Sequence, residues 1–198
     1  MIAKRLFDLV FSIPALVVLS PLMIVCAIWI KLDSNGPVLF RQERIGREGV
    51  PFKILKFRTM ADQNTGSKPL LTTQDDERIT RCGKILRRLK IDELPQFVNV
   101  VAGQMSIVGP RPEVGKYVDL YPESSRQKIL SVRPGITDNA SIKFRDEGAM
   151  LAAADNPEQE YIETILPTKL SIYEEYVDNQ SLAGDLLLIL RTAWSVVR

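Results

Sequence analysis

The sequence contains no histidine. This absence excludes Ser-His-Asp triads, histidine metal ligands and histidine acid–base catalysis, so any catalysis must use other side chains, above all carboxylates. Cysteine is scarce as well, because Cys26 and Cys82 are the only two, and no spacing typical of a metal or redox motif joins them. We therefore expect no disulfide framework, as in a protein exposed to the cytoplasm.

An excess of positive charge is missing too. The chain has 26 Lys and Arg residues against 24 Asp and Glu residues, which gives a net charge of +2. A nucleic-acid-binding domain is usually strongly basic, so we expect no nucleic-acid partner. The 198 residues suffice for one domain with a hydrophobic core, and they contain no internal repeat.

One long segment near the N-terminus lacks charge altogether. Residues 9–30 contain no Asp, Glu, Lys or Arg, and a stretch of about 20 apolar residues can cross a bilayer. Pro21 removes one backbone hydrogen bond, so we expect a break or kink at Ser20-Pro21, with the Ser20 hydroxyl satisfying the freed carbonyl. Basic residues flank both ends of the segment, namely Lys4, Arg5, Lys31, Arg41, Arg44 and Arg47. The preference of basic flanks for the cytoplasm leaves two interpretations open: a re-entrant helix, or a single kinked span with its C-terminal flank inside.

The next segments predict small elements. Residues 38–44 and 50–58 indicate two short strands around a glycine-containing turn, which together form a β-hairpin. Residues 61–76 have few apolar side chains and predict a loop that could cover a site. Residues 77–90 predict a helix with one apolar and one basic side, which could lie on a membrane surface or pack on the core.

The most informative stretch is 91–112. Asp92 and Glu93 stand just before a Leu-Pro pair, so the preceding helix should end there and a new one should start at Pro95. The two carboxylates would then lie at a helix entrance, where free N–H groups and the helix dipole favour an anion such as phosphate. A proline on each side of Arg111 restricts the backbone that presents its guanidinium. Together these features indicate phosphoryl chemistry.

The second half of the chain predicts helices, with a C-terminal helical region from about residue 140. The segment 182–197 is strongly apolar, but Asp185 and Arg191 make it too charged to span a membrane. It could pack on the domain, contact the membrane interface or bury itself against a second copy, so a homodimer is conceivable. The expected fold class is α/β and predominantly helical, with a membrane helix at 1–32 and a cytoplasmic domain at 33–198.

The stretch 91–112 closely resembles the signature of the bacterial sugar transferases, the monotopic polyprenyl-phosphate phosphoglycosyl transferases. The resemblance rests on Asp92-Glu93-Leu94-Pro95-Gln96, Asn99, Gly103, Met105-Ser106 and Gly109-Pro110-Arg111-Pro112. It extends from the apolar N-terminus to about Thr137. It implies a re-entrant N-terminal helix broken at Ser20-Pro21, amphipathic interfacial helices, and a catalytic domain on the cytoplasmic face of the bacterial inner membrane.

The resemblance also implies a reaction. A sugar-1-phosphate would move from a UDP-sugar to a membrane polyprenyl (undecaprenyl) phosphate with release of UMP, as the first membrane step of a bacterial glycan such as an exopolysaccharide. Asp92 is the implied nucleophile, which would attack the β-phosphate and form an aspartyl-phosphosugar. Glu93 would orient Asp92, ligate a metal or manage a proton. The implied cofactor is Mg²⁺ at Asp92 and Glu93.

Further residues receive roles from the same resemblance. Arg87, Arg111 and Arg58 would bind substrate phosphates, for which the planar guanidinium fork is well suited. Gln96 and Asn99 would line the site or serve the fold. The family's turn after Thr137 usually continues with a glycine, but this chain has Asp138. The nucleotide or sugar contacts of that loop therefore carry over only weakly.

Two other functions compete with the transferase. The chain could be a non-catalytic membrane adaptor that docks other glycan enzymes through its basic hairpin and amphipathic helices. It could also be a hydrolase that releases UMP from UDP-sugars. For an isolated pair, Asp92 and Glu93 would be read as residues that merely cap a helix. The membrane segment, the missing histidines and the long signature favour the transferase.

Overall fold

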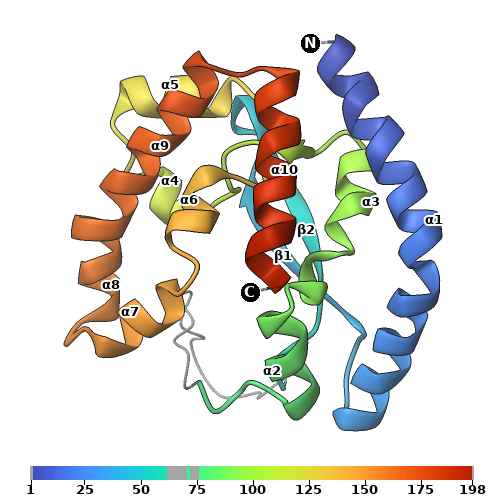
Figure 1. The fold of residues 1–198 in the computed structure, drawn as a ribbon. Helices are drawn as coiled ribbons and strands as arrows, with labels where there is room; N and C mark the ends of the chain where they lie inside the picture. Colours follow the sequence, from blue (N-terminus) through green and yellow to red (C-terminus); the bar gives the residue numbers. More distant parts are fainter. Residues whose placement is uncertain (1, 62–70, 72–75, 198) are drawn as a thin grey trace.

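The computed structural model describes residues 2–61, 71 and 76–197. Figure 1 shows α1 along one edge of the molecule, α3 and α10 beside it, and α4 to α9 at the opposite edge. The helices are α1 (Ile2–Asp33), α2 (Arg81–Arg88), α3 (Gln96–Val101), α4 (Gly115–Val118), α5 (Glu123–Leu130), α6 (Asn139–Lys143), α7 (Glu147–Ala153), α8 (Pro157–Glu160), α9 (Leu166–Asp178) and α10 (Leu182–Val197). Three short turns of other helical types are η1 (Arg47–Gly49), η2 (Ile91–Glu93) and η3 (Tyr161–Ile165). The predicted fold class, α/β and predominantly helical, is confirmed.

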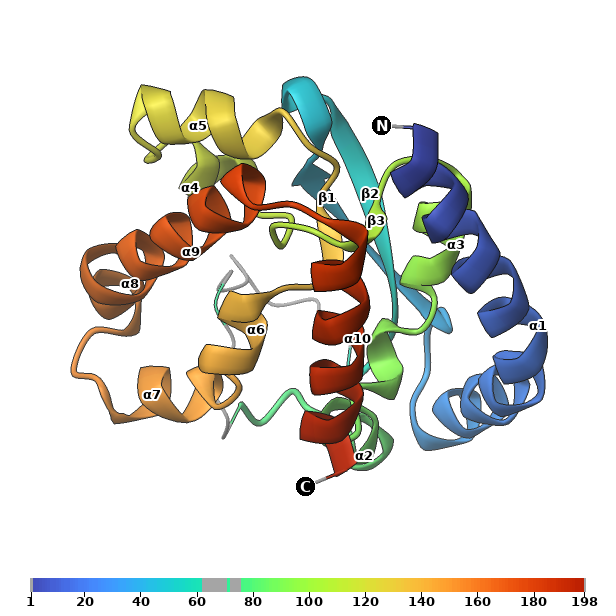
Figure 2. The same cartoon turned by 45° about the horizontal axis from the view of Figure 1, so that its top comes forward.

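The N-terminal helix α1 does not break at Ser20-Pro21. Its helical conformation is continuous from Ile2 to Asp33 and includes both Pro14 and Pro21. Figure 2 shows that the helix bends instead, so that its second half runs in a different direction from its first. The Ser20 hydroxyl donates a hydrogen bond to the Val17 carbonyl at 2.8 Å. This carbonyl is the one that Pro21 leaves without its usual partner, which explains how the helix continues through the proline.

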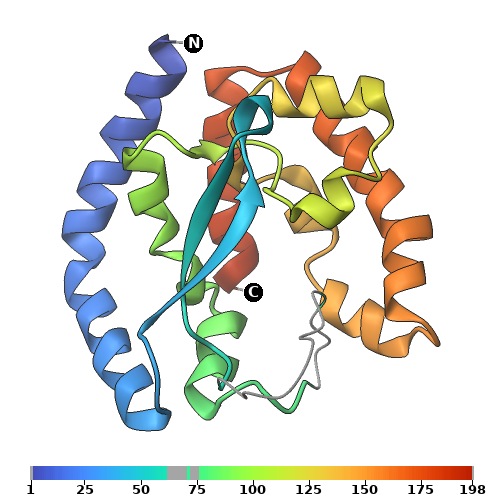
Figure 3. The ribbon, with the colours of Figure 1, turned by 180° about the vertical axis from the view of Figure 1, so that it is seen from behind.

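The predicted hairpin is confirmed. Strands β1 (Leu39–Ile45) and β2 (Pro51–Phe57) pair antiparallel, with Leu39 opposite Phe57 and Ile45 opposite Pro51. The connecting turn contains Glu48 at φ 59° and Gly49 at φ 77°, which are left-handed conformations typical of tight turns. Figure 3 shows the hairpin crossing between α3 and the helices of the C-terminal half.

A second, smaller sheet joins distant parts of the chain. Strands β3 (Ser106–Val108) and β4 (Gly135–Thr137) pair in parallel. A Cβ atom on Gly135 would lie 2.1 Å from the Gly109 nitrogen, so only glycine permits this approach. The Gly135 N–H donates to the Pro110 carbonyl at 2.9 Å. The segment that leads into Arg111 is therefore fixed by β4.

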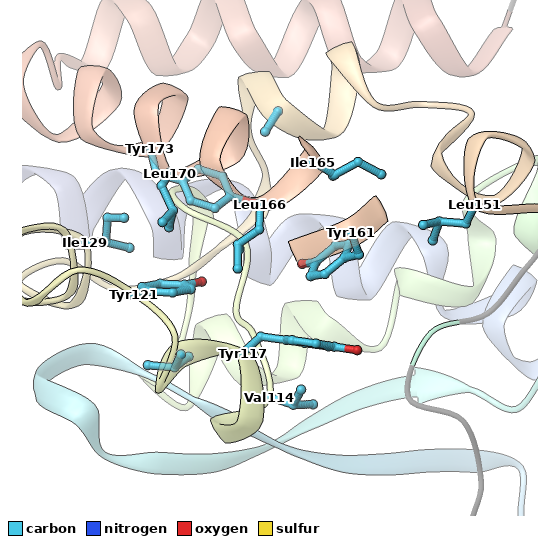
Figure 4. Packing of buried hydrophobic residues seen from close by; sticks show 12 residues of the cluster. Val114, Tyr117, Tyr121, Ile129, Leu151, Tyr161, Ile165, Leu166, Leu170 and Tyr173 are labelled. Atoms are coloured by element: carbon cyan, nitrogen blue, oxygen red, sulfur yellow. The ribbon is translucent and has the colours of Figure 1, made fainter. Parts of the chain in front are cut away.

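Three clusters of buried side chains form the core. The largest lies among α4, α5, α7, η3 and α9 and is rich in tyrosine, as Figure 4 shows for Tyr117, Tyr121, Tyr161 and Tyr173. A second cluster joins β2, α3, β3 and α10. A third joins the C-terminal half of α1 to β2 and α2. The expected C-terminal helical region is present, and the predicted loop at 61–76 falls mostly outside the described residues.

The apolar helix α10 packs on the domain through one face. Asp185 and Leu188 are buried there, whereas Leu186, Leu187, Leu190 and Trp194 are exposed. The Lys4 ammonium on α1 lies 2.7 Å from the Asp185 carboxylate. Packing on the domain is thus confirmed for one side of this helix, while the homodimer stays a prediction.

Candidate active site

The two carboxylates predicted from the sequence lie on η2, in the short connection between α2 and α3. Lys90 has a left-handed backbone, φ 55°, which turns the chain after α2. Pro95 immediately precedes α3, as expected. The N–H groups of Phe97 and Val98 donate to the carbonyls of Leu94 and Pro95. Two of the first-turn N–H groups at this helix entrance thus already have backbone partners, and the expected anion site there stays a prediction.

Glu93 is bound to two cations. Its carboxylate accepts a hydrogen bond from the Lys56 ammonium at 2.9 Å and further ones from both terminal nitrogens of Arg111. Burial alone would raise the pKa of Glu93, but the charges of Arg111 and Lys56 outweigh it and hold the pKa well below its usual range. Glu93 is therefore ionised and fixed.

Asp92 has the opposite surroundings. Its side chain is buried, 8% exposed, and its Oδ1 atom has no hydrogen-bond partner among the described residues. Burial and the neighbouring Glu93 charge raise the pKa of Asp92, although Lys56, Arg87 and Lys90 partly oppose the rise. A buried carboxylate without a partner is costly for the fold, and such groups occur where chemistry requires them.

Arg87 reaches toward this carboxylate from the last turn of α2. Its Nε donates to the Thr59 hydroxyl at 2.8 Å. In the part of the chain that the structure describes, neither terminal nitrogen of Arg87 makes a hydrogen bond. Burial lowers the pKa of Arg87 and the Asp92 charge raises it, so the two groups lie within each other's field. Among the described residues, the end of the Arg87 guanidinium thus has no hydrogen-bond partner, as the predicted phosphate contact requires.

Arg111 lies on the other side of Glu93. The pairing of β3 with β4 and the flanking prolines fix its backbone, as the sequence indicated. Its charge is balanced by Glu93, which raises the pKa of Arg111 further above its already high value. The structure therefore brings together Asp92, Glu93, Arg87 and Arg111, as the sequence predicted.

The structure corrects the predicted role of Arg58 as a phosphate ligand. Arg58 is buried, and its guanidinium donates to backbone carbonyls at the end of α1: Ser34 at 2.7 Å, Ile30 at 3.4 Å and Asn35. The Ser34 and Asn35 carbonyls lie just after the helix, where carbonyl groups lack intrahelical partners, and the Ile30 carbonyl also accepts from the Ser34 N–H at 3.2 Å. Arg58 thus holds α1 on the domain and is not available as a phosphate ligand.

Gln96 and Asn99 differ from each other. Asn99 bridges α3 and β2, since its side chain accepts from the Leu55 N–H at 3.0 Å and donates to the Lys53 carbonyl at 2.9 Å. Its role is structural, one of the two interpretations left open by the sequence. Gln96 is 1% exposed, and neither of its amide atoms has a partner among the described residues. It lies one turn after Asp92 and remains a candidate lining residue.

Two polar residues of the site were missed from the sequence. Lys56 pairs with Glu93, and Thr59 holds Arg87. Both belong to the Lys56-Phe57-Arg58-Thr59-Met60 segment, from which the family resemblance singled out only Arg58. The strand alternation of this segment could have indicated Lys56 equally well, but nothing local shows which side chain faces η2.

Asp138 occupies a position that needs no glycine. Its φ of −159° is extended backbone, and its carboxylate caps α6 by accepting from the Ser141 N–H at 2.8 Å. Burial raises the pKa of Asp138, and the Arg111 charge partly opposes this rise. The departure from the family's usual glycine therefore has no backbone cost.

The described residues offer a limited metal site. No cluster of three or more acidic or cysteine side chains that could hold a metal occurs among them. The unpartnered Asp92 oxygen suits a hard cation such as Mg²⁺, whereas the Glu93 carboxylate is already paired with Lys56 and Arg111. Asp92 therefore fits the expected metal ligand, and Glu93 fits it poorly.

Comparison with known proteins agrees with this geometry. A family described as bacterial sugar transferase matches residues 1–198. The chain belongs to the bacterial sugar transferase family. A UDP-glucose:undecaprenyl-phosphate glucose-1-phosphate transferase of Caulobacter vibrioides is 37% identical over 198 residues, which are 98% of this chain and 69% of the relative. An uncharacterized sugar transferase of Bacillus subtilis, EpsL, is 38% identical over 100% of this chain and 88% of its own length.

Other members of the family are longer. A UDP-glucose:undecaprenyl-phosphate glucose-1-phosphate transferase of Klebsiella pneumoniae is 44% identical over 144 residues, and the match covers 72% of this chain but 31% of that protein. This sugar transferase chain thus spans about a third of the Klebsiella relative. In the Caulobacter and Bacillus relatives, which match 98% and 100% of this chain, the match includes the stretch with the candidate site.

Proposed function

We propose that this chain is a phosphoglycosyl transferase that moves a sugar-1-phosphate from a UDP-sugar to a membrane polyprenyl phosphate with release of UMP. The observation that carries the proposal is the buried Asp92 carboxylate, whose Oδ1 has no hydrogen-bond partner among the described residues and whose charge acts on the nearby Arg87 guanidinium. The names of the relatives, which act between UDP-sugars and undecaprenyl phosphate, support the same substrates.

The proposed reaction has two steps. An oxygen of the ionised Asp92 attacks the β-phosphorus of the UDP-sugar, the bond from that phosphorus to the bridging oxygen breaks, and UMP leaves. An oxygen of the polyprenyl phosphate then attacks the same phosphorus, the bond to Asp92 breaks, and the carboxylate is regenerated. A carboxylate nucleophile divides one difficult transfer into two easier ones. The second step yields a polyprenyl-diphosphate sugar.

The cationic side chains of the chain serve the donor phosphates in this proposal. Arg87 offers two terminal nitrogens to phosphate oxygens, and a planar fork binds such oxygens in a bidentate manner. Glu93 keeps Lys56 and Arg111 in place beside Asp92 and does not compete as a nucleophile, since both of its cations hold it. Mg²⁺, when bound through Asp92 and substrate phosphates, would neutralise phosphate charge.

The placement at a membrane is also proposed. The helix α1 is long and apolar enough to cross a bilayer, and only 11% of its most apolar window is buried in the protein. Yet both of its ends are bonded to the same domain. At the N-terminal end, Arg5 donates to the Val100 and Val101 carbonyls at 2.6 and 2.8 Å. At the other end, Asp33 accepts from the Cys82 N–H at 3.1 Å.

These contacts favour the re-entrant interpretation over the spanning one. If α1 crossed the bilayer, its charged N-terminal turn would lie on the far side, and the bonds from Arg5 could not form. Exposed apolar side chains continue from α1 onto the neighbouring α2 and α3, namely Ile85, Leu89, Val98 and Val101. We therefore place this surface in the cytoplasmic leaflet of the bacterial inner membrane, with the catalytic domain in the cytoplasm.

Acceptor dependence tests the proposed function. Full-length protein in lipid nanodiscs is mixed with UDP-sugars and Mg²⁺, and UMP release is measured with and without polyprenyl phosphate. Multiple-turnover release that requires polyprenyl phosphate supports the transferase. Equal release without the lipid indicates the hydrolase, and no release from any UDP-sugar would contradict the proposal.

A further inference from the structure

Thr59 occupies a junction between the membrane helix and the candidate site. It lies two residues after the end of β2 and is 6% exposed. Its hydroxyl accepts the hydrogen bond from Arg87 Nε at 2.8 Å. Its neighbour Arg58 donates to the Ile30 carbonyl in the last turn of α1 and to the Ser34 carbonyl just after the helix. Thr59 is thus adjacent in sequence to the residue that anchors α1, and it is hydrogen-bonded to Arg87, whose pKa is lowered by burial and raised by the Asp92 charge.

The backbone of Thr59 is held tightly against α2. Its carbonyl accepts from the Thr80 N–H at 3.0 Å, immediately before α2 begins. A Cβ atom on Gly83 would lie 2.1 Å from the same carbonyl oxygen, so the helix approaches Thr59 as closely as only a glycine allows. The backbone that carries the Thr59 hydroxyl is therefore fixed relative to α2.

Arg87 needs such a fixed partner. Its side chain has several rotatable bonds, and ordering a long side chain only when substrate arrives costs binding free energy. The bond at Nε leaves both terminal nitrogens without a described protein partner, and it restricts where they can lie. We propose that Thr59 is a positioning residue, whose hydroxyl holds the Arg87 guanidinium so that its two terminal nitrogens meet a phosphate of the nucleotide-sugar donor.

The inference rests on the proposed function and adds to it a link to the membrane. The Asp33 carboxylate at the end of α1 accepts from the Cys82 N–H at 3.1 Å, in the first turn of α2. Arg58 and Thr59 are consecutive, and they bind α1 and Arg87 respectively. The Arg87 side chain is therefore held at a constant position relative to the C-terminal end of α1. A lipid-anchored phosphate would approach the site from this side.

A double-mutant cycle distinguishes positioning from a merely structural role. Thr59→Val and Thr59→Ser are made in the wild type and in Arg87→Ala, and kcat and KM for the UDP-sugar are measured in nanodiscs with polyprenyl phosphate. We expect Thr59→Val to lower kcat/KM roughly tenfold, because a hydrogen bond to a charged group is lost. Thr59→Ser retains the hydroxyl and should stay within about threefold of the wild type. In Arg87→Ala, Thr59→Val should cost less than about twofold.

Thr80→Ala is the matched control. Thr80 caps the same helix by accepting from the Gly83 N–H at 2.9 Å, but it does not touch Arg87. Its loss should lower the unfolding midpoint and leave kcat/KM unchanged in the folded protein. If Thr59→Val does not fold, Thr59→Ala removes the same hydroxyl in the same cycle.

Two outcomes would overturn this inference while leaving the proposed function intact. In the first, the wild type is active and Thr59→Val or Thr59→Ala has the same kcat/KM. In the second, removal of the hydroxyl lowers kcat/KM by the same factor in the wild type and in Arg87→Ala. A wild type that releases no UMP with any UDP-sugar would overturn the proposed function, and this inference with it. Loss of coupling between Thr59 and Arg87 is thus distinguishable from failure of the enzyme activity itself.

Discussion

The two adjacent carboxylates of η2, Asp92 and Glu93, have opposite electrostatic surroundings. On one side, Glu93 is surrounded by Lys56 and Arg111, and its pKa is lowered. On the other, Asp92 is buried, its Oδ1 has no hydrogen-bond partner among the described residues, and its pKa is raised. Adjacent residues of the same charge thus have opposite tasks. The paired carboxylate stabilises the site, whereas the unpaired one is available for reaction at a cost in stability.

The replacement Asp92→Asn should give the largest effect. Turnover should fall by at least about 10³-fold, because the amide cannot form the phosphoryl bond. The variant should also unfold at a higher urea concentration, because burial raises the pKa of Asp92 and the ionised carboxylate therefore opposes folding at neutral pH. UMP release and urea unfolding measure the two quantities. Residual turnover near the wild-type value would contradict the nucleophile role.

The replacement Glu93→Gln should destabilise the protein by about 3 kcal/mol, since it leaves two largely enclosed cations without their carboxylate. Because the folded pKa of Glu93 is lowered, its contribution is present at neutral pH and is lost as pH falls below about 4. Urea unfolding at pH 7 and at acidic pH measures this difference. Glu158→Gln is the control, because the Lys116–Glu158 pair is exposed and should contribute less than about 0.5 kcal/mol.

Replacing Arg87 and replacing Arg111 should have different effects on stability. Arg87→Ala should lower kcat/KM about 100-fold, with little effect on stability, because its terminal nitrogens have no described protein partner. Arg111→Ala should lower stability by about 2 kcal/mol as well as activity, because it leaves Glu93 with one cation fewer. Kinetics and urea unfolding of both variants test the difference. An equal loss of stability in both variants would contradict the assignment of Arg87 to substrate binding rather than to the fold.

The smallest expected effect is a shift of the pH profile. Activity should fall as pH decreases and Asp92 becomes protonated, with an apparent pKa above the ordinary value of about 3.9. Lys56→Met removes a charge that favours the ionised Asp92, so the acidic limb should move to higher pH. Lys53→Met, an exposed position on the same strand, should leave the limb in place. The kcat/KM profile from pH 4 to 8 tests both variants.

Much of the local structure could be predicted from the sequence. The apolar run gave α1, alternation and glycines gave the hairpin, and Pro95 marked the start of α3. The helix expected at 77–90 is shorter, Arg81–Arg88, because Thr80 caps it. Turns and caps are determined by neighbouring residues, so a sequence reveals them.

Long-range contacts explain what the sequence could not show. Arg58 and Lys56 are both basic residues of one segment, but one binds the end of α1 and the other binds Glu93. No local pattern distinguishes these partners. Likewise, α1 continues through Pro21, where the Ser20 hydroxyl donates to the carbonyl that the proline leaves without a partner. Proline predicts the missing hydrogen bond but not whether the helix breaks or bends.

The most direct measurement is the intact mass of the full-length protein after mixing with UDP-sugars and Mg²⁺ in the absence of polyprenyl phosphate. Wild type and Asp92→Asn are compared, with Glu93→Gln as a variant that keeps the reactive carboxylate. We predict that the wild type gains the mass of one phosphosugar with its cognate donor, and that Asp92→Asn gains none. An adduct that persists in Asp92→Asn would contradict the assignment of Asp92 as the nucleophile. Lipid-dependent UMP release without any adduct on the wild type would contradict this assignment as well.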